Sequence, residues 1–275
     1  MSDYLLRLKG IIFSILSFIH ERRKDTGGFA ATPRLPATIE DTYHAIGSIE
    51  LLNKFPSHGA WFPGYDVRKD SALLRYLSIP FYPLLDESKT VFQLLESRRL
   101  LGLEIDNKSV RSYVHSQLTA PFSLQKWYYL ARIVNDTLDG DLEFIHMFLK
   151  GSRRFVWRTV NEAWMYLYLA KAGCGVGDID IDEQGLAQWF KDCQNRDGGF
   201  GFMPQTTSFI ENCHACLGAL ALLGVTPKDA DASFNFIIGC HTGAGGFSRN
   251  GMAAPFLDAT WHAVASLSLI ALKRS

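Results

Sequence analysis

Apolar residues recur along the chain in blocks of about a dozen positions, separated by segments rich in glycine and proline. In blocks such as 42–52 and 213–223 the apolar side chains cover nearly the whole helical circumference, which is typical of a buried helix. An apolar pair closes an upstream helix before such blocks, at Phe18-Ile19, Trp189-Phe190 and Phe236-Ile237. The pattern predicts an all-α fold made of helix pairs, with one helix of each pair deeply buried.

A Gly-Gly-Phe motif occurs three times, with its second glycine at Gly28, Gly199 and Gly246. Twelve positions after this glycine each copy carries an acid: Glu40, Glu211 and Asp258. Fourteen positions after it stand Thr42, Cys213 and Thr260. Glycine ends a helix at little cost because it adopts the left-handed backbone conformation, and the prolines that follow each motif disfavour helix. One unit of helix, loop and helix is therefore repeated.

The spacing of the motifs predicts the number of units. Gly199 and Gly246 are 47 positions apart, and the 171 positions from Gly28 to Gly199 hold about four degenerate intervals. Helical stretches at 90–102, 122–149 and 160–173 lack the motif. We expect about five or six helix pairs. Because 275 residues, 47% of them apolar, suffice for one large core, we also expect a single domain over residues 1–275.

Gly-Gly-Phe, a proline-containing loop, an acid and an apolar helix together resemble the repeat of protein prenyltransferase β subunits and of squalene and hopene cyclases. The fullest copy is 194–201 with 211–224. The resemblance implies an α/α toroid, in which an inner ring of helices encloses a cavity for an isoprenoid. Candidate cavity residues are the aromatic and histidine side chains Tyr43, His44, Trp164, Tyr166, His214, Trp261 and His262. The same side chains could instead simply fill a core.

Prenyl transfer is the first reaction that the resemblance implies, on a prenyl diphosphate or polyprenyl chain. In such transferases an acid, a cysteine two positions later and a histidine one repeat further on hold zinc. Glu211 and Cys213 match the first two positions, but the register puts Ala259 at the third, and the nearest histidine is His262. The candidate zinc site Glu211, Cys213 and His262 is incomplete, so zinc is disfavoured as a cofactor.

The basic residues that would grip a diphosphate are missing from the expected positions, which hold Gln205 and Ser208. The densest basic cluster is elsewhere and comprises Lys150, Arg153, Arg154 and Arg158. It could meet a diphosphate or a lipid head group, although such a run is more often a solvated helix face.

Acid-initiated cyclisation is the alternative reaction. Cyclases carry an Asp-x-Asp-Asp-Thr element whose middle aspartate protonates the polyene, and residues 38–42 align with it as Thr-Ile-Glu-Asp-Thr. We expect Glu40 to be the acid, with Asp41 or His44 as its partner, and the repeat acids Glu211 and Asp258 are further catalytic candidates. Acids in a first helical turn are also favoured by the helix dipole alone. A noncatalytic lipid carrier or scaffold on the same fold is a third hypothesis.

The charge balance and the cysteine content limit which partners and which cellular compartment we expect for this protein. Lys plus Arg and Asp plus Glu are equal at 28 each, so no strong field attracts nucleic acid. Five cysteines without a pair of CxxC motifs suit a reducing compartment, and we expect a cytoplasmic protein. Whether an α-type helical partner subunit is required stays open.

The apolar run 10–19 is too short to span a bilayer, so we expect no transmembrane segment there. We interpret it as a buried helix. The alternative is a surface-seeking helix that contacts a membrane peripherally and is flanked by Arg7, Lys9, Arg22 and Arg23.

Overall fold

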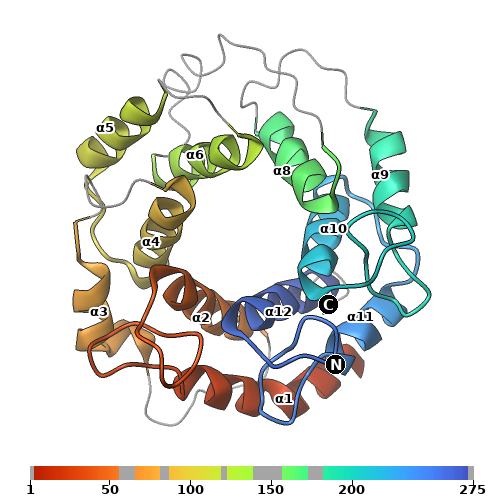
Figure 1. The fold of residues 1–275 in the computed structure, drawn as a ribbon, viewed down its shortest axis with the longest axis horizontal. Helices are drawn as coiled ribbons and strands as arrows, with labels where there is room; N and C mark the ends of the chain where they lie inside the picture. The colour runs from red at the N-terminus through yellow and green to blue at the C-terminus, as the bar shows by residue number, and fades with distance from the viewer. Residues whose placement is uncertain are drawn as a thin grey trace.

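In the computed structural model, helices alternate between an inner and an outer ring (Figure 1). The structure describes residues 3–55, 66–80, 87–118, 123–138, 157–172 and 182–271. The inner helices are α2 (Ile39–Leu52), α4 (Ser88–Leu101), α6 (Leu124–Thr137), α8 (Val160–Lys171), α10 (Ile210–Leu222) and α12 (Leu257–Ala271). The outer helices of the described part are α1 (Asp3–His20), α3 (Ser71–Leu77), α5 (Asn107–Gln117), α9 (Glu183–Asp192) and α11 (Ala230–Gly239). A short 3-10 helix, Val67–Lys69, precedes α3.

Each inner helix packs against two inner neighbours, and α12 packs against both α10 and α2. The first and last inner helices therefore meet, and the ring closes (Figure 1). Across the described ranges the only β-structure is isolated bridges at the Gly-Gly-Phe turns, such as Arg23 with Phe29. The predicted all-α fold, an α/α toroid of about five or six helix pairs, is confirmed.

Helices are also present where the sequence predicted them without a motif. Helix α4 covers the predicted stretch 90–102 up to Leu101, and α8 covers the predicted stretch 160–173 up to Lys171. The stretch 122–149 begins as α6, and its part from 139 onward lies outside the described residues. Of the basic cluster only Arg158 is described, whereas Lys150, Arg153 and Arg154 lie outside.

Each Gly-Gly-Phe motif forms a tight turn that docks on the next outer helix. The first glycine has a positive φ, 93° at Gly245, and a Cβ there would lie 2.3 Å from the backbone oxygen of Ser14 on α1. The second glycine, Gly246, lies against the ring of Phe18, one turn further along α1. Only glycine fits such an approach. This last turn thereby attaches the end of the chain to its first helix.

The residue fourteen positions after the second glycine hydrogen-bonds to the backbone of the phenylalanine in the motif. The Phe29 backbone N–H donates to Thr42 Oγ1 at 2.9 Å, and the Phe247 N–H donates to Thr260 Oγ1 at 3.0 Å. In the middle copy the backbone of Phe200 hydrogen-bonds to the buried thiol of Cys213. These positions of the repeat are structural: a small polar side chain accepts a hydrogen bond from a buried backbone N–H.

Helix α1, which contains the apolar run 10–19, packs one face on the inner ring. Ile12, Ile15 and Phe18 are buried, while Leu6 and Phe13 remain 57% and 63% exposed. The run is thus a half-buried outer helix. None of the helices in the described ranges is long and apolar enough to cross a membrane.

Candidate functional site: the central cavity

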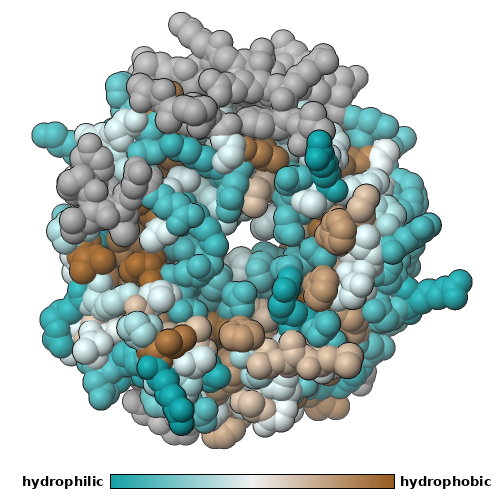
Figure 2. Space-filling model, viewed as in Figure 1, coloured by the Kyte–Doolittle hydropathy of each residue, from teal (hydrophilic) through white to brown (hydrophobic). Residues whose placement is uncertain are grey.

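The inner ring encloses a cavity of about 1160 Å³, which opens at the centre of the ring (Figure 2). Every inner helix contributes side chains at intervals of three or four residues, the spacing that keeps residues on one helix face. On α10 the lining residues are Glu211, His214, Gly218, Ala221 and Leu222, and on α12 they are Asp258, Trp261, His262, Ala265, Ser268 and Leu269. Each inner helix is therefore apolar around most of its circumference, and its cavity-facing side carries one row of lining residues that includes polar and charged side chains.

Charged side chains enter the cavity from the first turns of the inner helices, and Glu40 and Glu211 each form an ion pair there. Lys89 Nζ donates to Glu40 Oε1 at 2.6 Å, and Arg249 Nε donates to Glu211 Oε1 at 2.8 Å. Burial alone would raise the pKa of Glu40, but the hydrogen bond and charge of Lys89 outweigh it and hold that pKa below its ordinary value. Glu40 is therefore held in its ionised form.

Asp41, next to Glu40, also lines the cavity and has a different environment. Its backbone N–H donates to the N-cap residue Thr38, and the Thr38 hydroxyl donates to Asp41 Oδ2 at 2.7 Å. Burial raises the pKa of Asp41, and the charge of Glu40 raises it further. Asp41 thus retains its proton more readily than an exposed aspartate, whereas the prediction of Glu40 as the acid conflicts with its ion pair.

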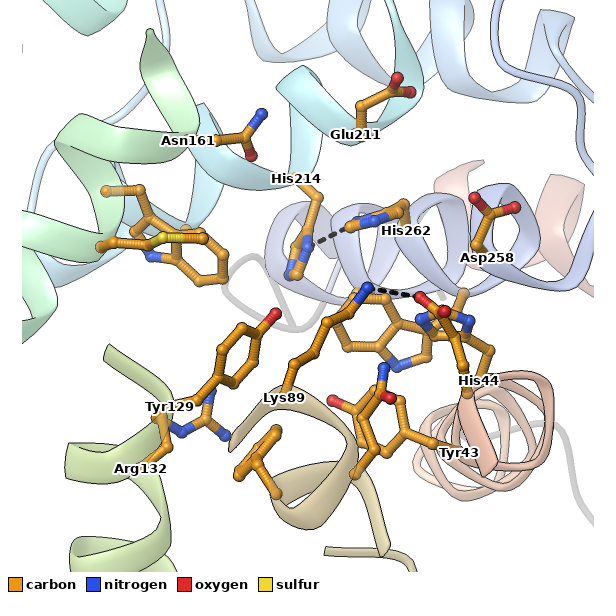
Figure 3. Close-up of a pocket in the computed structure, with 18 of the residues that line it drawn as sticks. Tyr43, His44, Lys89, Tyr129, Arg132, Asn161, Glu211, His214, Asp258 and His262 are labelled. Carbon is orange, nitrogen blue, oxygen red and sulfur yellow. Dashed lines mark hydrogen bonds and ion pairs between the residues drawn. The ribbon is translucent and has the colours of Figure 1, made fainter. Parts of the chain in front are cut away.

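Three histidines lie further inside the ring (Figure 3). His214 Nδ1 and His262 Nδ1 are 3.0 Å apart and hydrogen-bonded, and the ring of His44 lies 6.4 Å from that of His262. Burial lowers the pKa of His44 and of His214 to about 4, and it lowers the pKa of His262 well below its ordinary value. All three are therefore neutral imidazoles at neutral pH.

Two tryptophans, Trp164 and Trp261, pack against the histidine rings. The Trp261 ring lies 5.4 Å from the ring of His44 and 4.8 Å from that of His214, and Trp164 lies 5.2 Å from His214. The neighbouring inner helix leaves room for Trp261 at Gly47, where a Cβ would lie only 2.7 Å from the indole nitrogen. The glycine in the middle of α2 thus allows close packing of an aromatic ring.

A half-buried cation, Arg132, lies among further aromatic rings on the α6 side. Arg132 Nε donates to Asp136 Oδ2 at 2.7 Å, and its Nη1 donates to the hydroxyl of Tyr128 at 2.9 Å. Its guanidinium lies over the ring of Phe92, 4.5 Å from the centroid. This cation is satisfied by a carboxylate, a hydroxyl and a π-face.

Most of the predicted site residues line the cavity together: Glu40, Asp41, Tyr43, His44, Trp164, Glu211, His214, Asp258, Trp261 and His262. Tyr166 does not, because it lies two positions after Trp164 and therefore on another helix face. It is buried against Trp157, with ring centroids 4.8 Å apart, and Tyr168 lines the cavity in its place.

The structure does not bring the candidate zinc ligands together. Cys213 faces the Phe200 turn, and burial raises the pKa of its thiol. Glu211 is paired with Arg249, and His262 with His214. In the part of the chain that the structure describes, no group of three His, Cys, Asp or Glu side chains is placed to hold a metal ion.

Several cavity residues were not found from the sequence: Lys89, Phe92, Gln93, Tyr128, Tyr129, Arg132, Asp136, Asn161, Tyr168 and Arg249. Most lie on α4, α6 and α8, where no Gly-Gly-Phe motif fixes the register. The three- to four-residue spacing of polar and aromatic side chains along α6 was the available signal.

Comparison with known proteins agrees with this architecture. The sequence model of the prenyltransferase alpha-alpha toroid domain matches residues 4–78, 139–233 and 206–275. Two solved structures of the type II terpene cyclase MstE from Scytonema are similar, each at 12% identity. The apo structure has a TM-score of 0.57, and the alignment covers 97% of both chains. The structure in complex with geranylgeranyl dihydroxybenzoate, the substrate of that cyclase, has a TM-score of 0.56, and the alignment covers 98% of both chains.

At this identity the likeness to the cyclases shows the fold alone, and a search of curated protein sequences finds no match. The family match is broader, because it extends over well more than half of the chain. With the closed inner ring of helices, it shows that the chain belongs to the prenyltransferase alpha-alpha toroid family.

Proposed function

We propose that the cavity binds an isoprenoid chain and that the protein cyclises it by an acid-initiated mechanism, with Asp41 as the proton donor. The observation that carries the proposal is a cavity of about 1160 Å³, walled by aromatic rings, with a carboxyl of raised pKa in its lining. The aromatic and aliphatic part of this lining suits a hydrocarbon chain.

The environment of Asp41 suits proton donation to an alkene. Its raised pKa favours the protonated form, and the Thr38 hydroxyl, which donates to Oδ2, stabilises the carboxylate that forms as the proton leaves. The new C–H bond takes the alkene electron pair and leaves a carbocation. The faces of Trp261, Trp164 and Tyr43 would stabilise this charge, and loss of a proton from the last cation would end the reaction.

Prenyl transfer has less support than cyclisation. A transferase of the resembling kind needs a zinc-bound thiolate site, and the candidate ligands are apart. Among the described residues, the three cations that line the cavity are each paired with a carboxylate: Lys89 with Glu40, Arg132 with Asp136, and Arg249 with Glu211. A diphosphate would have to break such pairs.

The test is incubation of the purified protein with geranylgeraniol in D₂O, followed by extraction and gas chromatography with mass detection. Cyclisation gives an isomer with a new retention time and one deuterium, because the initiating proton comes from an exchangeable carboxyl. Asp41→Asn should abolish the product while the ligand still binds. Asp25→Asn, at an exposed side chain, is the matched control and should leave the product unchanged.

Other outcomes decide against cyclisation. Retention of geranylgeraniol without conversion would indicate a carrier. Full turnover by Asp41→Asn would exclude Asp41 as the acid.

A further inference from the structure

The rings of His214 and His262 lie end to end in the lining of the cavity (Figure 3). Their Nδ1 atoms are 3.0 Å apart and their ring centroids are 5.1 Å apart, so the Nδ1 atoms lie between the rings and the Nε2 atoms lie at the two outer ends. Among the described residues neither Nε2 has a hydrogen-bond partner, and neither is one of the polar atoms enclosed by protein without a partner. Both outer nitrogens are therefore open to the cavity, on opposite sides of the pair.

The Nδ1–Nδ1 hydrogen bond fixes where the protons of these two rings lie. A neutral imidazole has one N–H, so one ring must donate across the bond while the other accepts. The donating ring then has a lone pair at its outer Nε2, and the accepting ring has its N–H there. The pair thus presents one basic nitrogen to the cavity, and the hydrogen bond to the accepting ring strengthens when the donating ring becomes charged.

Of the two rings, His214 lies between both tryptophans of the cavity wall. The Trp164 ring is 5.2 Å from it and the Trp261 ring is 4.8 Å from it, in edge-to-face contacts. Aromatic rings stabilise a nearby cation through their π-electrons. A carbocation held by these two indole rings would therefore lie beside His214.

Several other groups that line the described cavity are poorer proton acceptors. Glu40, Asp136 and Glu211 are each paired with a cation, which lowers their basicity. The Nδ1 atom of His44 is enclosed by protein without a hydrogen-bond partner. A protonated His44 would bury an unsatisfied N–H there, whereas a protonated His214 has His262 as its acceptor.

We propose that His214 is the base that ends the cyclisation and that His262 positions it by accepting its Nδ1–H. The C–H bond next to the last cationic carbon breaks, its electron pair forms the new C=C bond, and the proton binds the lone pair at His214 Nε2. Transfer of that proton to water restores the neutral pair. This inference rests on the proposed function and adds the residue that decides which alkene is formed.

A weak base suffices for this step. Burial lowers the pKa of His214 to about 4, so at neutral pH the ring is uncharged and its lone pair is available. A C–H bond next to a carbocation is far more acidic than an imidazolium ion, so the proton still moves to the ring. A weakly basic ring then gives the proton up to water readily.

The test follows the products formed from geranylgeraniol by gas chromatography with mass detection. We expect the unmodified protein to form a cyclic isomer of the substrate, the product of proton loss. His214→Phe should still consume the substrate, because Asp41 starts the reaction, but should yield cyclic diols from water capture and other alkenes. A positioned base contributes about 10²–10⁴-fold to a proton transfer, so the share of the original isomer should fall by at least about tenfold.

Chemical rescue separates catalysis from a structural effect. His214→Ala leaves room for a small ring, and soluble imidazole should restore the original isomer, whereas pyrrole, which has the same size and no basic nitrogen, should not. His262→Gln, whose carbonyl oxygen can accept from His214 Nδ1, should keep more of the original isomer than His262→Phe. His115→Phe, at an exposed position of α5, should leave the products unchanged.

An unchanged product share in His214→Phe would overturn the inference and leave cyclisation standing. Restoration by pyrrole as well as by imidazole, or by neither, would also overturn it, and this comparison decides alone if His214→Phe does not consume the substrate. A cyclic diol as the main product of the unmodified protein would overturn it too, since water would then end the reaction. Absence of any cyclic product from the unmodified protein would refute the proposed function itself.

Discussion

At the scale of single residues, one buried backbone N–H explains why the repeat keeps a threonine or cysteine fourteen positions after its second glycine. The N–H of Phe247 has Thr260 Oγ1 as its acceptor, and the Phe200 backbone has the Cys213 thiol. Both acceptors are fully buried. A buried donor without an acceptor loses its hydration and gains nothing in return, so the choice at this position is narrow.

Substitutions at two of these positions test the role of the acceptor. Thr260→Val, which keeps the shape and removes the acceptor, should lower the free energy of unfolding by about 1–3 kcal/mol. Cys213→Thr installs the residue that the other two copies use and should be close to neutral for both stability and turnover. Urea denaturation gives the values, with Thr207→Val in an exposed loop as the control. Loss of turnover in a stable Cys213→Thr variant would instead revive a chemical role for the thiol.

At the scale of elements, the glycine turns act as the joints between successive helix pairs. Each turn lies against the backbone of the outer helix that follows it, with Gly27 against Ala72 and Gly198 against Ala232. The third turn lies instead against the first outer helix, with Gly245 against Ser14 of α1. The same local contact therefore extends the ring twice and closes it once.

The closing contact gives a sharp comparison between two nearby glycines. Gly245→Ala should destabilise the protein by about 1–3 kcal/mol through its positive φ alone, and further because its Cβ would press on the backbone of α1. Gly243→Ala, where a Cβ would meet nothing within 4 Å, should be nearly neutral. Thermal melting and limited proteolysis of α1 measure both effects. Equal melting temperatures for the two variants would contradict the role of this turn in closing the ring.

At the scale of the whole molecule, the toroid places three neutral histidine side chains in its central cavity. Inner helices from distant parts of the sequence surround His44, His214 and His262, and this enclosure lowers the pKa of all three. In the unfolded chain the same side chains have pKa values of about 6.5. Between about pH 6.5 and pH 4 the unfolded state therefore binds more protons than the folded state.

The free energy of unfolding should consequently fall as the pH is lowered through this window, and be fully retained above it. The lowered pKa of Glu40 adds to the loss at the acid end, while the raised pKa of Asp41 opposes it. His214→Phe should flatten the slope of stability against pH, measured by urea denaturation from pH 8 to pH 4, relative to His115→Phe. An unchanged slope would mean that His214 is already charged in the folded protein.

The sequence by itself determined the all-α repeat and the family, because a glycine turn and an apolar helix are local features whose residues lie within one unit. It also identified many of the cavity side chains, since acids and aromatics follow each motif at fixed spacing. Only the tertiary structure decided their roles. His214 and His262 are 48 positions apart, and Lys89 is 49 positions from Glu40, so each pair forms only when two neighbouring inner helices pack together. The contact with Lys89 holds Glu40 in its ionised form, and the histidine pair is joined through the Nδ1 atom of each ring. Cys213 lies on the face of α10 that contacts the Phe200 turn, where it cannot join a metal site with His262.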